Sequence, residues 1–474
     1  MKKKVIRDIS ASSLQVIINQ LSGVLIFYFS SRYLFKQSFG EINWSVAVLV
    51  TAFNILGCGI DQITVKQVAS GADAKKVLTL YFTHVLLTGA LFYGLLLAAC
   101  LFFPAFFRNH AVLLLMAVSQ LLIFFSMPFK QVATGKEKFR LLLLMSTCSN
   151  LLKVIALAIL GNRLTINLLV YVYIISSAIE LGFCVYITRV ELKLPFRLKW
   201  DKTEYIALIR HSLPQLGSII FNSAVARFDW ILLGLMSTTV VLAEYSFAYK
   251  VFELSTLPLL IIAPLLLPRF TRFFSHASEE YQAGKKQELL VVVRYEIIIA
   301  SLTALVLNLA WGPVIDALTN NKYGKVNIQT IFYLSLAIPF LYMNNFLWSV
   351  NFAQGHLKKV FVLVGIAFFI NLVGDIALIP FYGAAGAAIA YLLAIVIQSV
   401  FYVKTTAVED LGRAFGSLFI IMGLAVASGL TSKYIFNNAW AALPAGICMF
   451  ALLLVIFKQV KMADRPVFKR IITT

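Results

Sequence analysis

Apolar stretches of about 20 residues recur along almost the whole chain, and they constrain its fold more than any other feature. A helix of about 20 apolar residues crosses the hydrocarbon core of a bilayer, which is about 30 Å thick. Only 13% of the 474 residues are charged, whereas a soluble domain has about 25%. We therefore expect an all-α polytopic membrane protein, and we exclude a disordered chain or a small disulfide scaffold.

Charged clusters divide the apolar sequence into about 14 predicted transmembrane helices. Pro380 and Gly383 lie between two of these helices and predict a turn there. The expected limits of the helices are 10–33, 41–60, 77–103, 110–130, 141–161, 166–188, 211–236, 243–268, 289–313, 327–352, 360–380, 383–403, 414–432 and 438–457.

Lysine and arginine are unequally distributed between the two sides that this division creates. With an even number of spans and both termini in the cytoplasm, 31 of the 41 Lys and Arg residues lie inside and 7 lie outside. An excess of Lys and Arg in cytoplasmic loops is the usual signal of membrane topology. The net charge of +20 is therefore explained by topology, and we expect no nucleic-acid partner.

Short sequence similarities predict two copies of a six-span unit. Val132–Lys136 resembles Phe352–His356, and Asn150–Leu157 resembles Asn371–Leu378 at nearly the same offset. Because six is even, both copies enter the membrane from the same side, as in parallel-repeat transporters. The expected divisions are an N-lobe (1–188), a cytoplasmic linker (189–210), a C-lobe (211–405) and a C-terminal part with two further spans and a basic tail (406–474).

Three cations fall within predicted spans and are candidates for binding an anionic substrate group: Arg227, Lys153 and Lys250. Charged side chains are costly in a bilayer and usually face a cavity or a partner. Arginine suits phosphate because its planar guanidinium donates two parallel hydrogen bonds. The alternative is structural pairing, since Lys250 and Glu253 are spaced i, i+3 and Asp229 could pair with Lys250 or Lys153.

Four acids in the spans are candidates for ion coupling or for charge pairing: Asp229, Glu253, Asp375 and Glu180. Asp375 and Glu180 could bind a proton or sodium in a coupled cycle, or could simply hold helices together. The sequence has no phosphate loop, no HExxH pattern and no nucleophile–base set. We therefore expect a protein that is not an enzyme and that uses no cofactor and no metal.

Motifs in a fixed order resemble the polysaccharide-transporter branch of the multidrug/oligosaccharidyl-lipid/polysaccharide superfamily. They are Ser38–Glu41, Asp229 followed by Ala243–Lys250, Leu267–Phe270, and the turn Leu378–Ala390, which is near the pattern IPxYGxxGAAIA. The resemblance implies two six-span lobes and a flippase for undecaprenyl-pyrophosphate-linked oligosaccharides. It also implies a cationic cavity for the pyrophosphate, onto which Arg227 maps best.

The same resemblance implies a bacterial inner-membrane protein that serves O-antigen, capsule or exopolysaccharide synthesis. Its partners would be the lipid-linked oligosaccharide, membrane lipids, and a glycan polymerase with chain-length machinery. A cation-coupled drug exporter of the same superfamily is the alternative function. A membrane-embedded glycan polymerase is a third hypothesis. The short outer loops disfavour it, because an active site for external sugars needs an external segment large enough to form a concave pocket.

Overall fold

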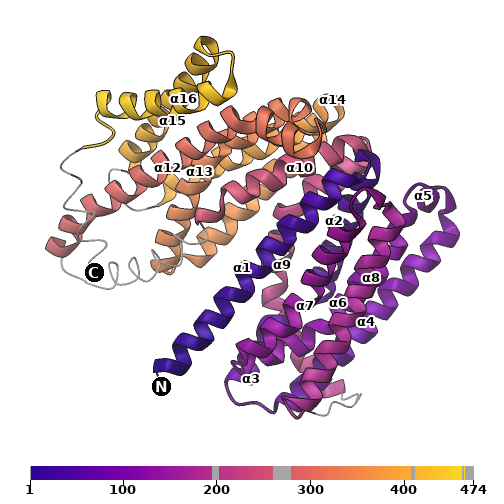
Figure 1. The fold of residues 1–474 in the computed structure, drawn as a ribbon. Coiled ribbons are helices and arrows are strands. Elements are labelled where there is room, and N and C mark those ends of the chain that lie inside the picture. Colours follow the sequence, from indigo (N-terminus) through magenta and orange to yellow (C-terminus); the bar gives the residue numbers. More distant parts are fainter. Residues whose placement is uncertain (1, 195–201, 260–278, 407–410, 462–463, 465–474) are drawn as a thin grey trace. The chain divides into compact units, whose positions relative to one another are not determined.

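The described residues fold into helices joined by short turns, without a β-strand among them. The computed structural model describes residues 2–194, 202–259, 279–406, 411–461 and 464. Its α-helices are α1 (Lys2–Tyr33), α2 (Lys36–Leu56), α3 (Ile60–Ala69), α4 (Ala74–Phe102), α5 (Pro104–Asn109), α6 (Ala111–Gly135), α7 (Phe139–Leu160), α8 (Ile166–Val190), α9 (Lys202–Met236), α10 (Thr239–Ser255), α12 (Glu279–Thr319), α13 (Ile328–Ala353), α14 (Leu357–Thr405), α15 (Leu411–Ile435) and α16 (Ala439–Ile456) (Figure 1).

The helices group by their contacts into two compact units, which are described separately. The first unit comprises Met1–Gly234 and Thr238–Ala243, and the second comprises Leu235–Ser237 and Glu244–Thr474. The predicted linker 189–210 lies within the sequence limits of the first unit, and its residues 195–201 fall outside the described part of the chain. The predicted lobe limits stay a prediction.

Each predicted span overlaps at least one of these helices, so the all-helical prediction is confirmed for the described residues. Ten described helices are long and apolar enough to cross a membrane. Residues 260–268 of the predicted span 243–268 lie outside the described residues, as does the motif Leu267–Phe270. The number 14 therefore stays a prediction, while the helical, polytopic character does not depend on it.

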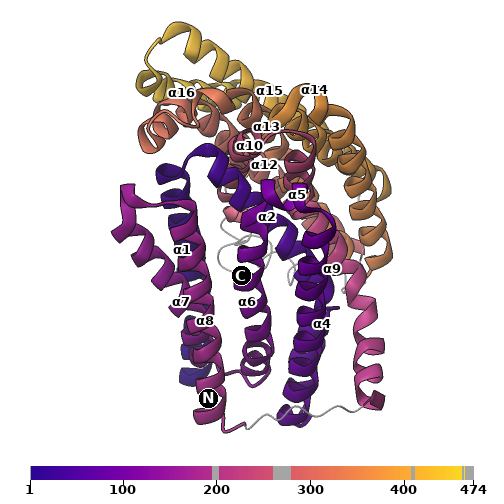
Figure 2. The same cartoon turned by 90° about the vertical axis from the view of Figure 1, so that its right-hand side faces the viewer.

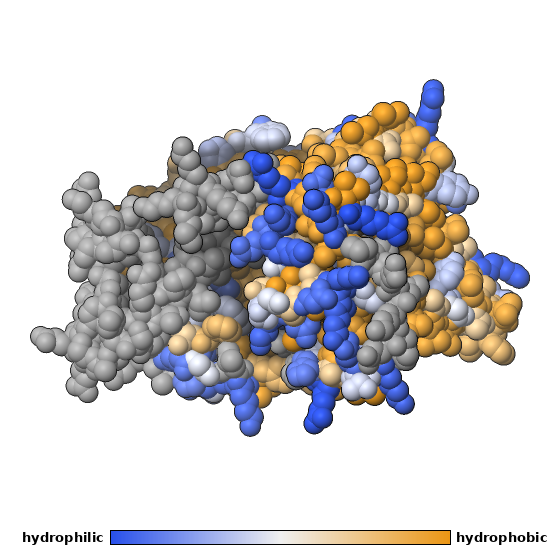
Figure 3. Space-filling model, turned by 90° about the horizontal axis from the view of Figure 1, so that it is seen from below, coloured by the Kyte–Doolittle hydropathy of each residue, from blue (hydrophilic) through white to orange (hydrophobic). Residues whose placement is uncertain are grey.

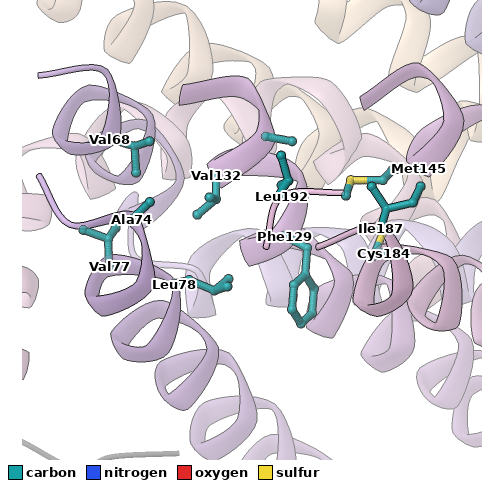
Figure 4. Close-up of a cluster of buried hydrophobic side chains, with 11 residues drawn as sticks. Val68, Ala74, Val77, Leu78, Phe129, Val132, Met145, Cys184, Ile187 and Leu192 are labelled. Carbon is teal, nitrogen blue, oxygen red and sulfur yellow. The ribbon is translucent and has the colours of Figure 1, made fainter. Parts of the chain in front are cut away.

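The first unit is built around α6, which packs against α2, α3, α4 and α8 (Figure 2). At one end of α6, side chains from five helices interdigitate in an apolar core. Phe129 and Val132 of α6 lie in this core with Val68 of α3, Leu78 of α4 and Met145 of α7, all at most 7% exposed (Figure 4). Burial of such side chains contributes about 1.5–3 kcal/mol each in water, and close packing replaces that driving force in lipid. This core fixes the ends of α3, α4 and α6 relative to one another.

The outward face of α4 is apolar, as a surface in contact with lipid should be. Leu91, Leu95 and Leu101 are 65%, 60% and 81% exposed. In a soluble protein such a row of exposed leucines would mark an interaction surface. Seen from below, the part of the first unit at the right of Figure 3 carries hydrophilic side chains at its end and hydrophobic ones at its rim. This distribution fits helices whose flanks face hydrocarbon and whose ends face water.

Helix α14 contains two predicted spans and a break between them. Its 49 residues would extend about 70 Å as a straight helix, more than twice the thickness of the hydrocarbon core. The break lies at Gly383, whose φ of 53° and ψ of −126° are not helical. The turn predicted between Pro380 and Gly383 is therefore present in the structure.

The two limbs of α14 lie against each other as an antiparallel hairpin. A Cβ atom added at Gly386 would lie 2.5 Å from the carbonyl oxygen of Leu378, and one added at Gly374 would lie 2.8 Å from the Cβ of Ala390. Both pairs are placed symmetrically about Tyr382 in the sequence. Small residues that let two helix backbones approach are the usual basis of helix packing in membranes.

Side-chain amides connect helices within each unit. Asn150 of α7 donates to the Oδ1 of Asn19 on α1 over 3.1 Å. In the second unit, Asn344 of α13 donates to the Oε1 of Gln398 over 3.0 Å and accepts from the hydroxyl of Ser399 over 2.6 Å, both on α14. Interhelical hydrogen bonds of this kind are worth about 0.6–2 kcal/mol in membrane proteins.

The turns after α6 and α13 share one hydrogen-bond pattern. After α6, the amides of Lys136 and Lys138 donate to the carbonyls of Val132 and Ala133. After α13, the amides at 354 and 356 donate to the carbonyls at 350 and 351 in the same way. In the structure Val132 thus corresponds to Val350, whereas the sequence similarity between Val132–Lys136 and Phe352–His356 aligns it with Phe352, two residues later. Both turns are helix C-caps, for which several short sequences are compatible.

Replacing Gly386 with alanine should destabilise the hairpin, because the new methyl group would overlap the backbone of Leu378. Overpacking of this kind costs about 1–3 kcal/mol. We expect Gly386→Ala to unfold at a lower temperature than the native protein in detergent, followed by tryptophan fluorescence. Gly423→Ala in α15 is the control, since no atom lies within 4 Å of its added Cβ. Equal unfolding temperatures for the two variants would contradict the hairpin packing.

Candidate functional site

Helix α9 carries Arg227 and runs beside α2 in the opposite direction. Near one end, the indole Nε1 of Trp44 on α2 donates to the carbonyl of Ile231 over 3.3 Å. Near the other, the imidazole of His84 on α4 contacts the carbonyl of Leu56 at 2.8 Å and the hydroxyl of Tyr205 at 2.9 Å. Arg227 therefore lies along α2, one helical turn from the Trp44 contact.

The guanidinium of Arg227 is held by an aromatic ring rather than by an acid. Its Cζ lies 4.3 Å from the centre of the Trp230 ring, and Trp230 is only 3% exposed. A cation over an indole face gains about 0.5–2 kcal/mol and keeps its hydrogen-bond donors free. The Nη1 atom of Arg227 is buried and has no hydrogen-bond partner among the described residues. A buried donor without a partner costs about 1–3 kcal/mol, which an incoming acceptor would recover.

Glu180 lies in a buried hydrogen-bonded network inside the first unit. It forms an ion pair with Lys130 of α6 and accepts hydrogen bonds from the hydroxyls of Ser149 and Ser126. The side chain of Glu180 is 5% exposed and that of Lys130 is 15% exposed. This arrangement corresponds to the charge-pairing alternative for Glu180. Lys130 is the last residue of the predicted span 110–130, and it is not among the partners predicted for Glu180.

Lys153 lies near the same network. It is 6% exposed, and its Nζ is 5.1 Å from the centre of the Tyr173 ring. The charges of Glu180 and Lys130 both act on it. Lys153 thus lies among protein groups, and no hydrogen bond, ion pair or ring contact joins it to Arg227 within the described part of the first unit.

In the second unit, Lys250 donates to Glu253 in an ion pair with an N–O distance of 2.7 Å. This is the i, i+3 pairing expected as the structural alternative. Asp375 is fully buried and accepts a hydrogen bond of 2.8 Å from the amide of Asn371, one helical turn earlier in α14. Asp229, in the first unit, is 3% exposed, and its Oδ1 accepts from the backbone amide of Trp230 over 2.8 Å.

A cavity of about 720 Å³ opens in the first unit between α2, α3, α4 and α6. Its polar lining includes Asp61, Gln62, Gln120 and Gln131, none of which is among the predicted site residues. A signal was present in the sequence, because positions 120, 124, 127 and 131 share one face of a helix. The cavity and Arg227 belong to the same unit. No group of three metal-ligating side chains occurs among the described residues.

His84 joins the end of α2 to the start of α9 through its contacts with the carbonyl of Leu56 and the hydroxyl of Tyr205. Tyr205, at the start of α9, lies outside the predicted spans, and burial raises the pKa of its hydroxyl. The phenol thus stays protonated at neutral pH, since its usual pKa is already about 10. It can therefore hold its hydrogen bond with His84 across the physiological range.

The sequence of this chain matches a known protein family. The family described as "Polysaccharide biosynthesis protein" matches residues 5–274, which is more than half of the chain. A search of curated protein sequences finds no match.

Solved structures share the fold at low sequence identity. The structure described as "Lipid II flippase MurJ, inward closed conformation" has a TM-score of 0.72 and 14% identity, covering 94% of this chain and 98% of that chain. An inward-facing multidrug resistance MATE family transporter of the MOP superfamily has a TM-score of 0.65 and 14% identity, covering 82% and 96%. A MOP superfamily transporter from Pyrococcus furiosus, with a binding pocket of reverse polarity, has a TM-score of 0.56 and 13% identity, covering 85% and 94%.

These similarities confirm the predicted polytopic membrane fold, because they extend over most of the chain and of each neighbour. The neighbours are described as a flippase and as transporters rather than as enzymes. The chain therefore belongs to the polysaccharide biosynthesis protein family and has the fold of the multidrug/oligosaccharidyl-lipid/polysaccharide transporters.

Proposed function

We propose that this protein is a flippase that moves an undecaprenyl-pyrophosphate-linked oligosaccharide across the bacterial inner membrane, for O-antigen, capsule or exopolysaccharide synthesis. The lipid tail stays in the bilayer while the pyrophosphate and sugars cross by alternating access. In this proposal both termini are cytoplasmic, and a glycan polymerase with its chain-length machinery uses the product. Family membership and the similarity to a structure described as a lipid II flippase support the substrate class.

The observation that carries the proposal is the environment of Arg227. A guanidinium with a buried and unpartnered Nη1, oriented by the indole of Trp230, is prepared for an oxyanion. Pyrophosphate offers several such acceptors, and arginine binds them with paired hydrogen bonds. Lys250 and Lys153 are less suited to this role, because Lys250 is paired with Glu253 and Lys153 lies among Tyr173, Glu180 and Lys130.

Arg227→Gln should lower translocation of lipid-linked oligosaccharide in reconstituted vesicles by about 10- to 100-fold, since hydrogen bonds to charged groups contribute about 1.5–3 kcal/mol. Arg227→Lys should retain part of the activity, because it keeps the charge but loses the planar fork. Arg210→Gln, an exposed arginine on the same helix, is the matched control and should transport normally. Normal transport by Arg227→Gln would remove its assigned role.

A cation-coupled drug exporter is the second candidate function, and the superfamily neighbours described as multidrug transporters favour it. Within the first unit, Glu180 would be the natural coupling acid. Its ion pair with Lys130 and its two serine donors argue for a structural role instead. Breaking one side of a buried pair leaves an uncompensated charge, whereas removing both charges can be nearly neutral.

Glu180→Gln and Lys130→Met should therefore each destabilise the protein by about 3–5 kcal/mol, and the double variant should recover most of that loss. Thermal unfolding in detergent measures all three. Changes in sodium concentration and pH should alter the translocation rate of the double variant by the same factor as that of the native protein. A stable Glu180→Gln variant that transports without the native ion dependence would instead identify Glu180 as a coupling group.

A further inference from the structure

The cavity in the first unit is built by one face of each of two helices. Val50, Phe53 and Asn54 of α2 and its C-cap residue Gly57 line it at spacings of i, i+3, i+4 and i+7. These spacings place all four residues on the same side of a helix. At about 720 Å³ the cavity lies in the range of sites that bind small organic ligands, about 300–1,000 Å³.

On α6, Gln120, Phe124, Met127 and Gln131 line the cavity along one stripe. A different face of α6 holds Lys130, which is paired with Glu180 of α8. The helix thus directs its ion pair toward α8 and its amides toward the cavity. The side chains of Gln120 and Gln131 make no hydrogen bond to any described residue.

A break between α2 and α3 brings further polar groups to the cavity. Cys58 and Gly59 have φ values of 50° and 74°, so the chain leaves the helix there and restarts at Ile60. Asp61 and Gln62 follow directly and line the cavity. The Oδ1 atom of Asp61 is buried without a hydrogen-bond partner in the described part of the chain. The break thus brings a buried carboxylate oxygen without a protein partner to the wall of the cavity.

The chemistry of the lining selects one class of ligand. Amide groups both donate and accept, and a carboxylate accepts, which matches hydroxyl groups that do both. Phe53 and Phe124, with ring centres 5.1 Å apart, add an aromatic wall. No lysine or arginine is among the described residues that line the cavity, so it offers no counter-charge to a phosphate. A neutral, polyhydroxylated ligand fits this lining better than a pyrophosphate does.

We propose that this cavity is a subsite for the sugars of the lipid-linked substrate, separate from the pyrophosphate contact at Arg227. The inference rests on the proposed flippase function and adds to it where the glycan binds. The position of α9 beside α2 supports binding of one substrate at both sites. Arg227 lies near the start of α2, and the end of α2 lines the cavity. The oligosaccharide would thus be held in the first unit while its pyrophosphate contacts the guanidinium.

The test compares three probes on the full-length protein in detergent, by microscale thermophoresis. The probes are undecaprenyl pyrophosphate, the undecaprenyl-pyrophosphate-linked oligosaccharide extracted from cells that make this protein, and the free glycan released from that extract. We expect the Kd of the glycosylated lipid to be lower than that of the bare lipid by a factor of about 10 or more. The sugars would add a few hydrogen bonds, and a tenfold change in Kd corresponds to about 1.4 kcal/mol. The double variant Gln120→Leu/Gln131→Leu should lose this difference and keep native affinity for the bare lipid.

Affinity for the bare lipid reports whether each variant is folded, and Gln131→Asn serves as a milder second variant with a smaller expected loss. Gln67→Leu, on α3 but outside the cavity lining, is the matched control and should bind every probe as the native protein does. Equal affinity of the native protein for glycosylated and bare lipid would overturn the sugar subsite and leave the flippase proposal standing.

The remaining outcomes also separate the two proposals. If the native protein binds no lipid probe, the proposed function itself fails. If Gln67→Leu loses the sugar-dependent affinity as the double variant does, the cavity is not the subsite. Sodium-dependent binding that Asp61→Asn abolishes, with no effect of the glycan, would assign the cavity to a cation and overturn the proposal.

Discussion

The hydrogen bonding of the backbone in a medium without water is the constraint on which the rest of this structure depends. A helix satisfies its own amides and carbonyls, so a chain immersed in lipid becomes helical wherever it can. Departures from the helix are tolerated only where the protein supplies other partners. At the break after α2, Cys58 and Ile60 donate to the carbonyls of Ile55 and Gly57, and His84 contacts the carbonyl of Leu56. The irregular segment is therefore stabilised from within the first unit and can line a cavity.

The same constraint sorts the polar side chains into two groups. Glu180, Asn150 and Asn344 bond to neighbouring helices and hold them together. The Nη1 of Arg227 and the Oδ1 of Asp61 are buried without such bonds in the described residues, so folding leaves their hydrogen-bonding capacity unused. The first is a cationic donor and the second an anionic acceptor. A substrate with a charged linkage and neutral sugars has groups of both complementary kinds.

Features set by local chain chemistry were predictable from the sequence. Apolar length predicted the helices, the residues between Pro380 and Gly383 predicted the turn in α14, and the i, i+3 spacing made an ion pair of Lys250 with Glu253 the structural alternative to substrate binding. Features set by distant packing were not. Glu180 and Lys130 are 50 residues apart, and Lys130 is the last residue of the predicted span 110–130. The cavity was missed because the face that α6 turns toward α2 is a property of the folded bundle and not of either helix alone.

The hairpin in α14 has a consequence for biogenesis. The turn between its limbs is short, with the break at Gly383, and Phe381 and Tyr382, 81% and 62% exposed, carry no charge to anchor it in water. The first limb leaves the ribosome before the limb against which Gly374 and Leu378 pack. The packing between the two limbs can therefore form only after the second limb, which ends at Thr405, has been synthesised.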